Sequence, residues 1–93
     1  MNPDKVVNIS LNAKGVPVPD QDPVQVKKGN QKLKWCASFP FTIDIEDYSD
    51  VSYGSDADAP HHCKTGLFDK ERRHKYSITA NGITNDPDID IRP

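Results

Sequence analysis

The sequence lacks any long hydrophobic run. No stretch among its 93 residues approaches the roughly 18 to 20 apolar residues that a membrane-spanning helix requires. Its first residues, Met-Asn-Pro-Asp-Lys, have neither the basic start nor the apolar middle of a secretion signal. We therefore expect a cytoplasmic protein with no membrane partner, or a periplasmic or secreted one if a leader has been removed.

A block of basic charge is also missing. Twelve Lys and Arg residues are interspersed with 14 Asp and Glu residues, which gives a formal net charge of −2. This pattern lacks the cluster of basic residues that is typical of nucleic-acid-binding proteins, so we expect no nucleic-acid partner. Cysteine is scarce, since only Cys36 and Cys63 are present, and their separation matches no zinc-ribbon or redox spacing. They form one disulfide or remain two thiols, and without a leader the thiols are favoured.

The familiar catalytic motifs are absent as well. The sequence contains no Gly-x-Ser-x-Gly, no glycine loop that would cradle a phosphate, and no His-Glu-x-x-His. A nucleophilic site built from Cys63 with His62 or His74 would need a third orienting group and a pocket, and the sequence indicates neither. We therefore expect a protein that is not an enzyme and that has no cofactor.

What the sequence does contain is a series of short alternating segments. Only 34% of the residues are hydrophobic, which favours a thin core between two facing sheets. Apolar and polar residues alternate over residues 5–11, 24–26, 31–37, 41–45, 76–80 and 89–91, with turn residues between them. This pattern predicts a single domain over residues 1–93, an all-β Greek-key sandwich of about seven strands with little helix and a loose N-terminus at residues 1–4.

The largest apolar side chains gather in the middle of the chain. Residues 31–37 and 41–45 read as a hairpin of two buried strands joined at Pro40, with core positions at Leu33, Trp35, Phe41, Ile43 and Ile45. A proline-interrupted piece at residues 16–23 predicts a sheet edge or an irregular crossing, because proline cannot donate to a sheet ladder. The dipeptide Asn81-Gly82 predicts a tight turn.

Residues 46–62 differ from the rest because they are rich in acidic side chains, Ser, Gly and Pro. We interpret them as a long loop excursion, and loops of this length are usually functional or mobile. The acidic residues suggest calcium, but the Asp-x-Asp-x-Asp-Gly pattern with its terminal Glu is missing, so solvated charges are favoured. The basic residues 72–75 predict an ion-paired surface against this loop, with docking of an anion or an acidic partner as the alternative.

One tripeptide concentrates side chains that can bind metal ions. His61, His62 and Cys63 are the candidate ligands for copper or zinc. Neighbouring side chains on an extended strand point in opposite directions, so at most one of the two histidines would share a site with Cys63. A further ligand would have to come from Cys36 or His74, if the fold brings either of them close.

The order of several segments resembles a known family. A Val-x-Val-Lys-Lys-Gly-Asn turn, a Leu-Lys-Trp strand, a Pro-Phe-Thr-Ile strand and a closing Tyr-x-Ile-x-Ala strand with Asp-Pro-x-Ile-x-Ile are similar to cupredoxin-like domains over residues 24–91. The resemblance implies the fold but not electron transfer, because Phe41 and Ala80 stand where the family places a histidine and the cysteine ligand. The later histidine and methionine are also missing between residues 81 and 90.

These observations lead to two functional hypotheses. The first is a non-catalytic binding or structural module, monomeric, that contacts an unknown protein partner through its loops, above all residues 46–62 and the neighbouring basic segment. The alternative is a metal-handling protein that binds copper or zinc through the segment His61, His62 and Cys63.

Overall fold

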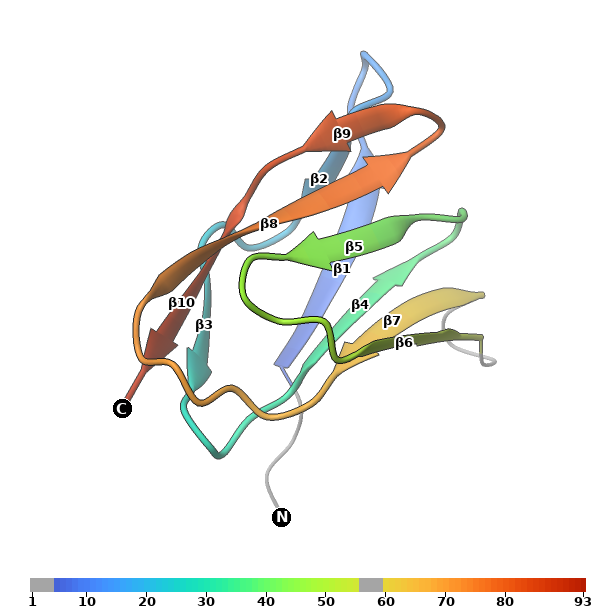
Figure 1. Cartoon of the computed structure of the whole chain (residues 1–93). Helices are drawn as coiled ribbons and strands as arrows, with labels where there is room; N and C mark the ends of the chain where they lie inside the picture. Colours follow the sequence, from blue (N-terminus) through green and yellow to red (C-terminus); the bar gives the residue numbers. More distant parts are fainter. Residues whose placement is uncertain (1–4, 56–59) are drawn as a thin grey trace.

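Ten strands in two facing sheets make up the fold in the computed structural model, which describes residues 5–55 and 60–93 (Figure 1). The first sheet contains, in spatial order, β2 (Pro17–Pro19), β1 (Lys5–Leu11), β4 (Leu33–Ala37), β7 (His61–Thr65) and β6 (Val51–Gly54). The second contains β3 (Val24–Lys27), β10 (Asp88–Arg92), β8 (Arg73–Ala80) and β5 (Thr42–Ile45), and β9 (Ile83–Asn85) pairs with β8.

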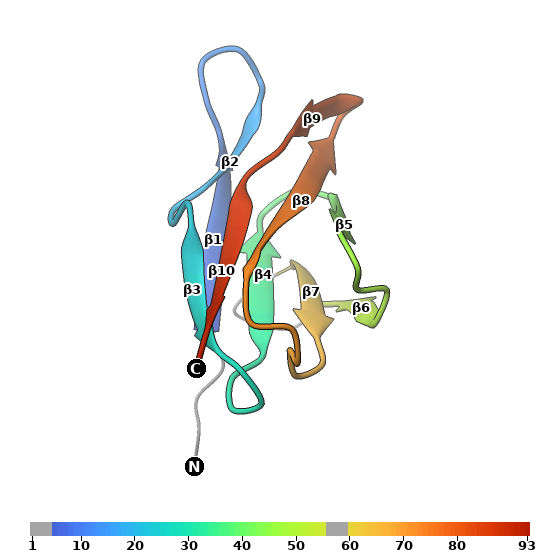
Figure 2. The same cartoon turned by 60° about the vertical axis from the view of Figure 1, so that its left-hand side comes forward.

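The predicted all-β sandwich is therefore confirmed, with ten strands rather than about seven. Both sheets are mixed, because β1 runs parallel to β4 and β3 runs parallel to β10, while the remaining named pairs are antiparallel (Figure 2). Within the part of the chain that the structure describes there is no helix, and so none that could cross a membrane.

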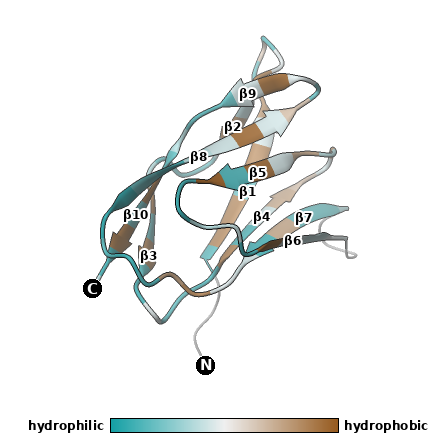
Figure 3. Cartoon of the chain, viewed as in Figure 1, coloured by the Kyte–Doolittle hydropathy of each residue, from teal (hydrophilic) through white to brown (hydrophobic). Residues whose placement is uncertain are grey.

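The interior is filled by residues that alternate along the strands. The alternation appears in Figure 3 as bands of opposite hydropathy on strands such as β5. All five core positions predicted from the middle of the chain are buried. The buried hydrophobic residues are Val7, Ile9, Val24, Val26, Leu33, Trp35, Ala37, Phe41, Ile43, Ile45, Cys63, Phe68, Tyr76, Ile78, Ala80, Ile89 and Ile91. Burial of each large side chain contributes about 1.5–3 kcal/mol to folding.

The predicted hairpin of residues 31–37 and 41–45 is wrong. Strand β4 pairs with β1 and β7 in the first sheet, whereas β5 pairs with β8 in the second. The bend between them carries the chain across the sandwich. The apolar pattern is the same in both arrangements, because Trp35 and Ile43 point into one core from opposite sheets.

The predicted loop excursion at residues 46–62 also needs correction. It contains the whole of β6 and the first two residues of β7, and the strands β6 and β7 pair in an antiparallel register. Residues 56–59 of this segment, and the predicted loose N-terminus at residues 1–4, lie outside the described residues. Strand β6 was missed because only Val51 and Tyr53 are apolar in it and both side chains remain partly or well exposed.

The turn and edge predictions agree with the structure. Asn81 and Gly82 have φ values of 57° and 79° and connect β8 to β9, as a two-residue hairpin turn requires. The proline-rich segment supplies β2, which lies at an edge of the first sheet.

Candidate functional site

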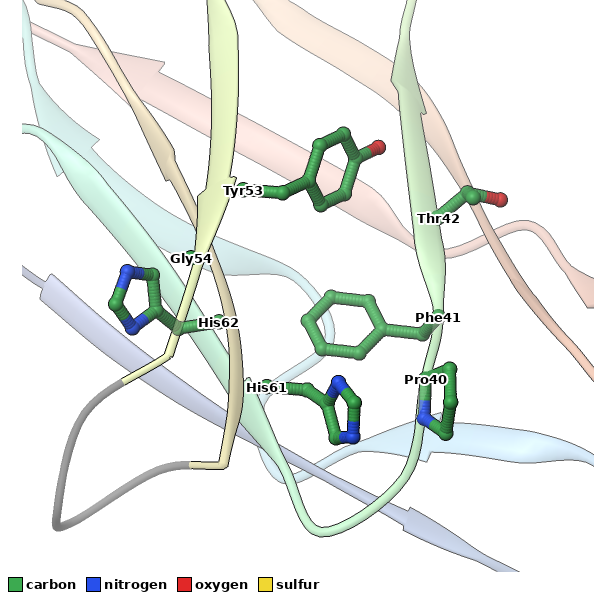
Figure 4. Close-up of a pocket in the computed structure, with 7 residues that line it drawn as sticks. All are labelled: Pro40, Phe41, Thr42, Tyr53, Gly54, His61 and His62. Carbon is green, nitrogen blue, oxygen red and sulfur yellow. The ribbon is translucent and has the colours of Figure 1, made fainter.

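The tripeptide predicted to bind metal lies on β7, where the strand separates its side chains. The rings of His61 and His62 lie on opposite sides of β7 (Figure 4). Cys63 shares the face of His61, because it follows His61 by two residues on the strand. His61 and His62 are half-buried, whereas Cys63 is fully buried in the core. The structure therefore does not bring His61, His62 and Cys63 together as one ligand set.

Cys63 has the properties of a core side chain. It lies opposite Trp35 in the β4–β7 register and opposite Tyr53 in the β6–β7 register. Burial raises the pKa of its thiol to about 11, and the hydrogen bond with Tyr53 offsets only part of that effect. Metal binding requires the thiolate, which is scarce at neutral pH when the pKa is this high.

His62 has a different set of neighbours. It lies opposite Cys36 across β4 and β7 and opposite Gly54 across β6 and β7. A Cβ atom at Gly54 would come within 2.7 Å of the His62 Nε2 atom, so the glycine leaves room for the ring. Cys36 and His62 supply two potential ligands, fewer than the three or four of zinc sites. Cys36 and Cys63 face opposite sides of the sheet and are thiols that are not joined in a disulfide.

A hollow of about 240 Å³ opens at the side of the sandwich where β5 and β6 are the outermost strands. The rings of Phe41, Tyr53 and His61 face this space, as Figure 4 shows. Its lining is formed by Pro40, Phe41, Thr42, Tyr53, Gly54, His61 and His62. Among the residues that the structure describes, no acidic residue, lysine or arginine lines the hollow, so its character is aromatic and apolar.

Tyr53 is an aromatic side chain of that hollow that is held by hydrogen bonds. Its side chain is 52% exposed, yet its hydroxyl accepts a hydrogen bond from the Ile43 amide at 2.8 Å and donates one to the Ile43 carbonyl at 3.2 Å. Partial burial raises the pKa of this hydroxyl, which keeps it protonated and able to donate. An exposed aromatic ring is thus fixed in place by the backbone of the facing sheet.

A second concentration of ligand-capable atoms lies away from the tripeptide. Glu46, Asp47 and His74 each place one such atom within 4.8 Å of the other two. His74 is 1% exposed, and its Nδ1 atom makes no hydrogen bond. That atom lies 4.0 Å from the Glu46 Oε1 atom and 3.8 Å from the Asp47 Oδ2 atom.

The local backbone explains how two neighbouring carboxylates reach the same histidine. The Glu46 amide donates to the Lys75 carbonyl and so continues the pairing of β5 with β8. Asp47 then adopts a φ of 68°, which ends the strand. Because side-chain alternation ends there, Glu46 and Asp47 both approach His74 at the start of β8.

The aromatic ring of Tyr48 supports the same cluster from one side. It makes an edge contact with the His74 ring at 5.2 Å between centroids and with the Phe68 ring at 4.9 Å. Its hydroxyl accepts hydrogen bonds from the Asp69 and Lys70 amides and donates to the Asp69 carboxylate. These bonds hold the loop before β8 against the end of β5.

The basic segment at residues 72–75 is ion-paired, but only Arg72 pairs with the acidic segment as predicted. Arg72 pairs with Glu46 and Asp47, while Arg73 and Lys75 pair with Asp88. His74 is not part of this exposed surface, because its strand position points inward.

The convergence of the acidic residues on His74 was not predicted from the sequence. It depends on the antiparallel β5–β8 pair, which places residue 46 beside residue 75 and which the sequence did not indicate. Of the acidic residues behind the calcium hypothesis, Asp56 and Asp58 lie outside the described residues. Comparison with protein-family models, with curated proteins and with solved structures finds no match to this chain.

Proposed function

We propose that this domain is a non-catalytic binding module that contacts a partner protein through the hollow between β5 and β6. The observation that carries the proposal is Tyr53, an exposed ring fixed by two hydrogen bonds to Ile43. Tyrosine supplies a large contact area at a small entropy cost, and a ring already held in one orientation loses still less freedom on binding.

The chemistry of the hollow favours an extended protein segment that offers one apolar side chain. Phe41, Pro40 and Tyr53 provide the apolar walls, and His61 adds a polar rim. Proline and aromatic side chains are the usual occupants of shallow aromatic grooves of this kind. This surface belongs in part to residues 46–62, the segment expected to make contact.

Two of the edge strands, β5 and β2, favour side-chain docking over strand addition and support a monomer. The outward amide and carbonyl of Ile43 are occupied by the Tyr53 hydroxyl, and the Ile45 carbonyl accepts from the Tyr48 amide. At the opposite edge of the first sheet, Pro17 and Pro19 in β2 cannot donate to another strand.

The cupredoxin-like Greek-key identity belongs to the same proposal. Support comes from the two mixed sheets, and the resemblance assigns two positions of this chain to the family's histidine and cysteine ligands. Phe41 and Ala80 stand there, both are buried, and neither offers a ligand atom. The domain we propose is thus a copper-free member of that fold.

A displayed library of random peptides tests the contact surface. The wild-type domain should select peptides that contain proline or aromatic residues, and Tyr53→Ala should weaken their binding by about tenfold or more, as expected for a central aromatic contact. Val6→Ala is the matched control, because Val6 is an exposed apolar residue on β1, at 43% exposure. Selected peptides that bind Tyr53→Ala as tightly as the wild type would contradict the proposed surface.

A further inference from the structure

The Nδ1 atom of His74 lies between two carboxylates and has no hydrogen-bond partner. The ring is fully buried, Nδ1 has no hydrogen-bond partner, and two carboxylate oxygens lie about it at 3.8 Å and 4.0 Å. Buried polar atoms without partners are rare in native proteins, and a bound ion is one of the few physical reasons for their occurrence.

The other nitrogen of the ring identifies the tautomer. The Nε2 atom lies 3.1 Å from the Lys70 carbonyl oxygen, which can only accept a hydrogen bond. Nε2 therefore carries the proton, and in the neutral ring Nδ1 presents a lone pair toward Glu46 and Asp47. The Nδ1 lone pair and the two carboxylates repel one another, and a positive charge placed between them would relieve this repulsion.

We propose that Glu46, Asp47 and His74 bind a divalent transition-metal ion, with the His74 Nδ1 atom and one oxygen of each carboxylate as ligands. Zinc bonds to such atoms are about 2.0–2.2 Å long. The carboxylate side chains are exposed at 51% and 37%, so they are able to close on the ion from their present positions. This site shares no residue with the hollow at Tyr53 and does not depend on the binding-module proposal.

The surroundings of His74 match those of metal-binding histidines. Such histidines almost always donate the second ring N–H to a carbonyl or carboxylate, which fixes the tautomer and the ring orientation. Here the Lys70 carbonyl accepts that bond, and the Tyr48 hydroxyl holds the Lys70 amide at 2.9 Å. The ligand is therefore oriented before any ion arrives.

The ligand set also selects the kind of ion. One imidazole nitrogen with two carboxylate oxygens suits zinc and its neighbours in the transition series. Calcium prefers six to eight oxygen ligands, and magnesium is bound through oxygen as well. A zinc-like ion would complete its coordination with water at the exposed side of the two carboxylates.

Arg72 is the cation that pairs with both of these carboxylates. It pairs with Asp47 and lies 3.5 Å from Glu46, and its side chain is 52% exposed. The guanidinium bonds to the carboxylates and leaves Nδ1 without a hydrogen bond, so it satisfies only part of the cluster. A metal ion would displace Arg72 from the carboxylates, and this arginine therefore competes with the ion.

Calorimetric titration of the tag-free protein with Zn²⁺ tests the site. The wild type should bind one ion per chain in a saturable manner, and excess Ca²⁺ should not compete. Asp47→Asn and Glu46→Gln should each weaken binding by about tenfold or more. Arg72→Met should tighten binding by about tenfold, because a competing charge is removed. An increase in affinity on removal of a surface arginine is an outcome that a merely structural ion pair would not produce.

The controls distinguish this site from zinc binding elsewhere on the chain. Asp47→Asn keeps the backbone conformation, since Asn also adopts positive φ, and a thermal melt will show that it is folded. Asp44→Asn and Arg73→Met make the same charge changes nearby and should leave the affinity unchanged. The proposal is overturned if zinc does not saturate, if Asp47→Asn binds as tightly as the wild type, or if replacing both His61 and His62 with Asn abolishes binding.

Discussion

Two groups of ligand-capable residues in this protein are organised in opposite ways. His61, His62 and Cys63 are adjacent in the sequence, and the strand that contains them directs their side chains to the two faces of a sheet. Glu46 and Asp47 are far from His74 in the sequence, and the pairing of β5 with β8 brings their ligand atoms within 4.8 Å. Consecutive residues of a regular strand thus point to opposite faces of the sheet. Residues on paired strands can instead bring their side chains together.

The local backbone accounts for this difference. Strand β7 is regular, so its side chains alternate and Cys63 is drawn into the core. At the end of β5 the positive φ of Asp47 interrupts alternation, and consecutive carboxylates reach one histidine. A metal site built from consecutive residues of a β protein thus needs a break in regular structure as well as the right side chains.

The largest expected effect concerns the aromatic support of the His74 cluster. Phe68 is 1% exposed and contacts the Tyr48 ring that lies against His74. Phe68→Ala should lower the free energy of unfolding by about 3–5 kcal/mol, as large-to-small changes in cores do. Urea denaturation measures this cost. A loss below about 1 kcal/mol would mean that the cluster does not depend on core packing.

The burial of Cys63 should appear in the pH dependence of stability. Its pKa rises from 9.0 to about 11 because burial disfavours the thiolate. The folded protein therefore holds the proton more tightly than the unfolded chain. This difference contributes about 2–3 kcal/mol to the free energy of unfolding. The contribution is fully present below about pH 9 and is lost as the pH rises toward 11.

A variant distinguishes this thiol from the tyrosines. Burial also raises the pKa of Tyr53 and Tyr76, but from 10.0, so their contributions are lost only at higher pH. In Cys63→Ala the decline in stability should begin near pH 10 instead of about pH 9, as linkage requires. Urea denaturation over this pH range is the measurement. An unchanged onset in the variant would show that Cys63 is more accessible than the core placement implies.

A smaller effect is expected from the hydroxyl of Tyr48. Tyr48→Phe keeps the ring against His74 but removes the acceptor of the Asp69 and Lys70 amides. Stability should fall by about 1–2 kcal/mol. Because the Lys70 carbonyl orients His74, zinc affinity should fall by about tenfold as well. Calorimetry on the same sample as the denaturation experiment checks both values, and unchanged zinc affinity would show that the loop does not orient the histidine.

The smallest expected effect distinguishes the His74 cluster from the tripeptide on β7. In Gly54→Ala the new Cβ atom meets the His62 ring at 2.7 Å, and the ring moves because the contact is with the far end of a side chain. The cost should be less than about 1 kcal/mol, and zinc affinity should not change. Calorimetry and urea denaturation again provide the test. A drop in zinc affinity would place His62, not His74, at the metal.

The sequence predicted the fold class and the core better than the connections. Alternation at Trp35 and Ile43 marked both as interior residues, because burial depends on local periodicity. It did not reveal that their strands lie in different sheets, since that depends on which partners compete for each edge. The strand at residues 51–54 was missed because it buries little.

The candidate site shows the same limit. His74 lies in a charged stretch, and only the fold places its ring in the core with one nitrogen on the Lys70 carbonyl. The ion pairs of Arg72 with the acidic residues could be predicted from opposite charge alone. The orphaned Nδ1 atom could not, because it is a consequence of packing and not of composition.

Nitrogen-resolved NMR of the three histidine rings during Zn²⁺ titration tests the proposed metal site most directly. We expect the His74 Nδ1 resonance to shift to a saturating value at one equivalent of zinc, with Nε2 still protonated, while the rings of His61 and His62 keep their signals. Saturable shifts at His61 or His62, with His74 unaffected, would contradict the site at Glu46, Asp47 and His74 and return the metal to the tripeptide on β7.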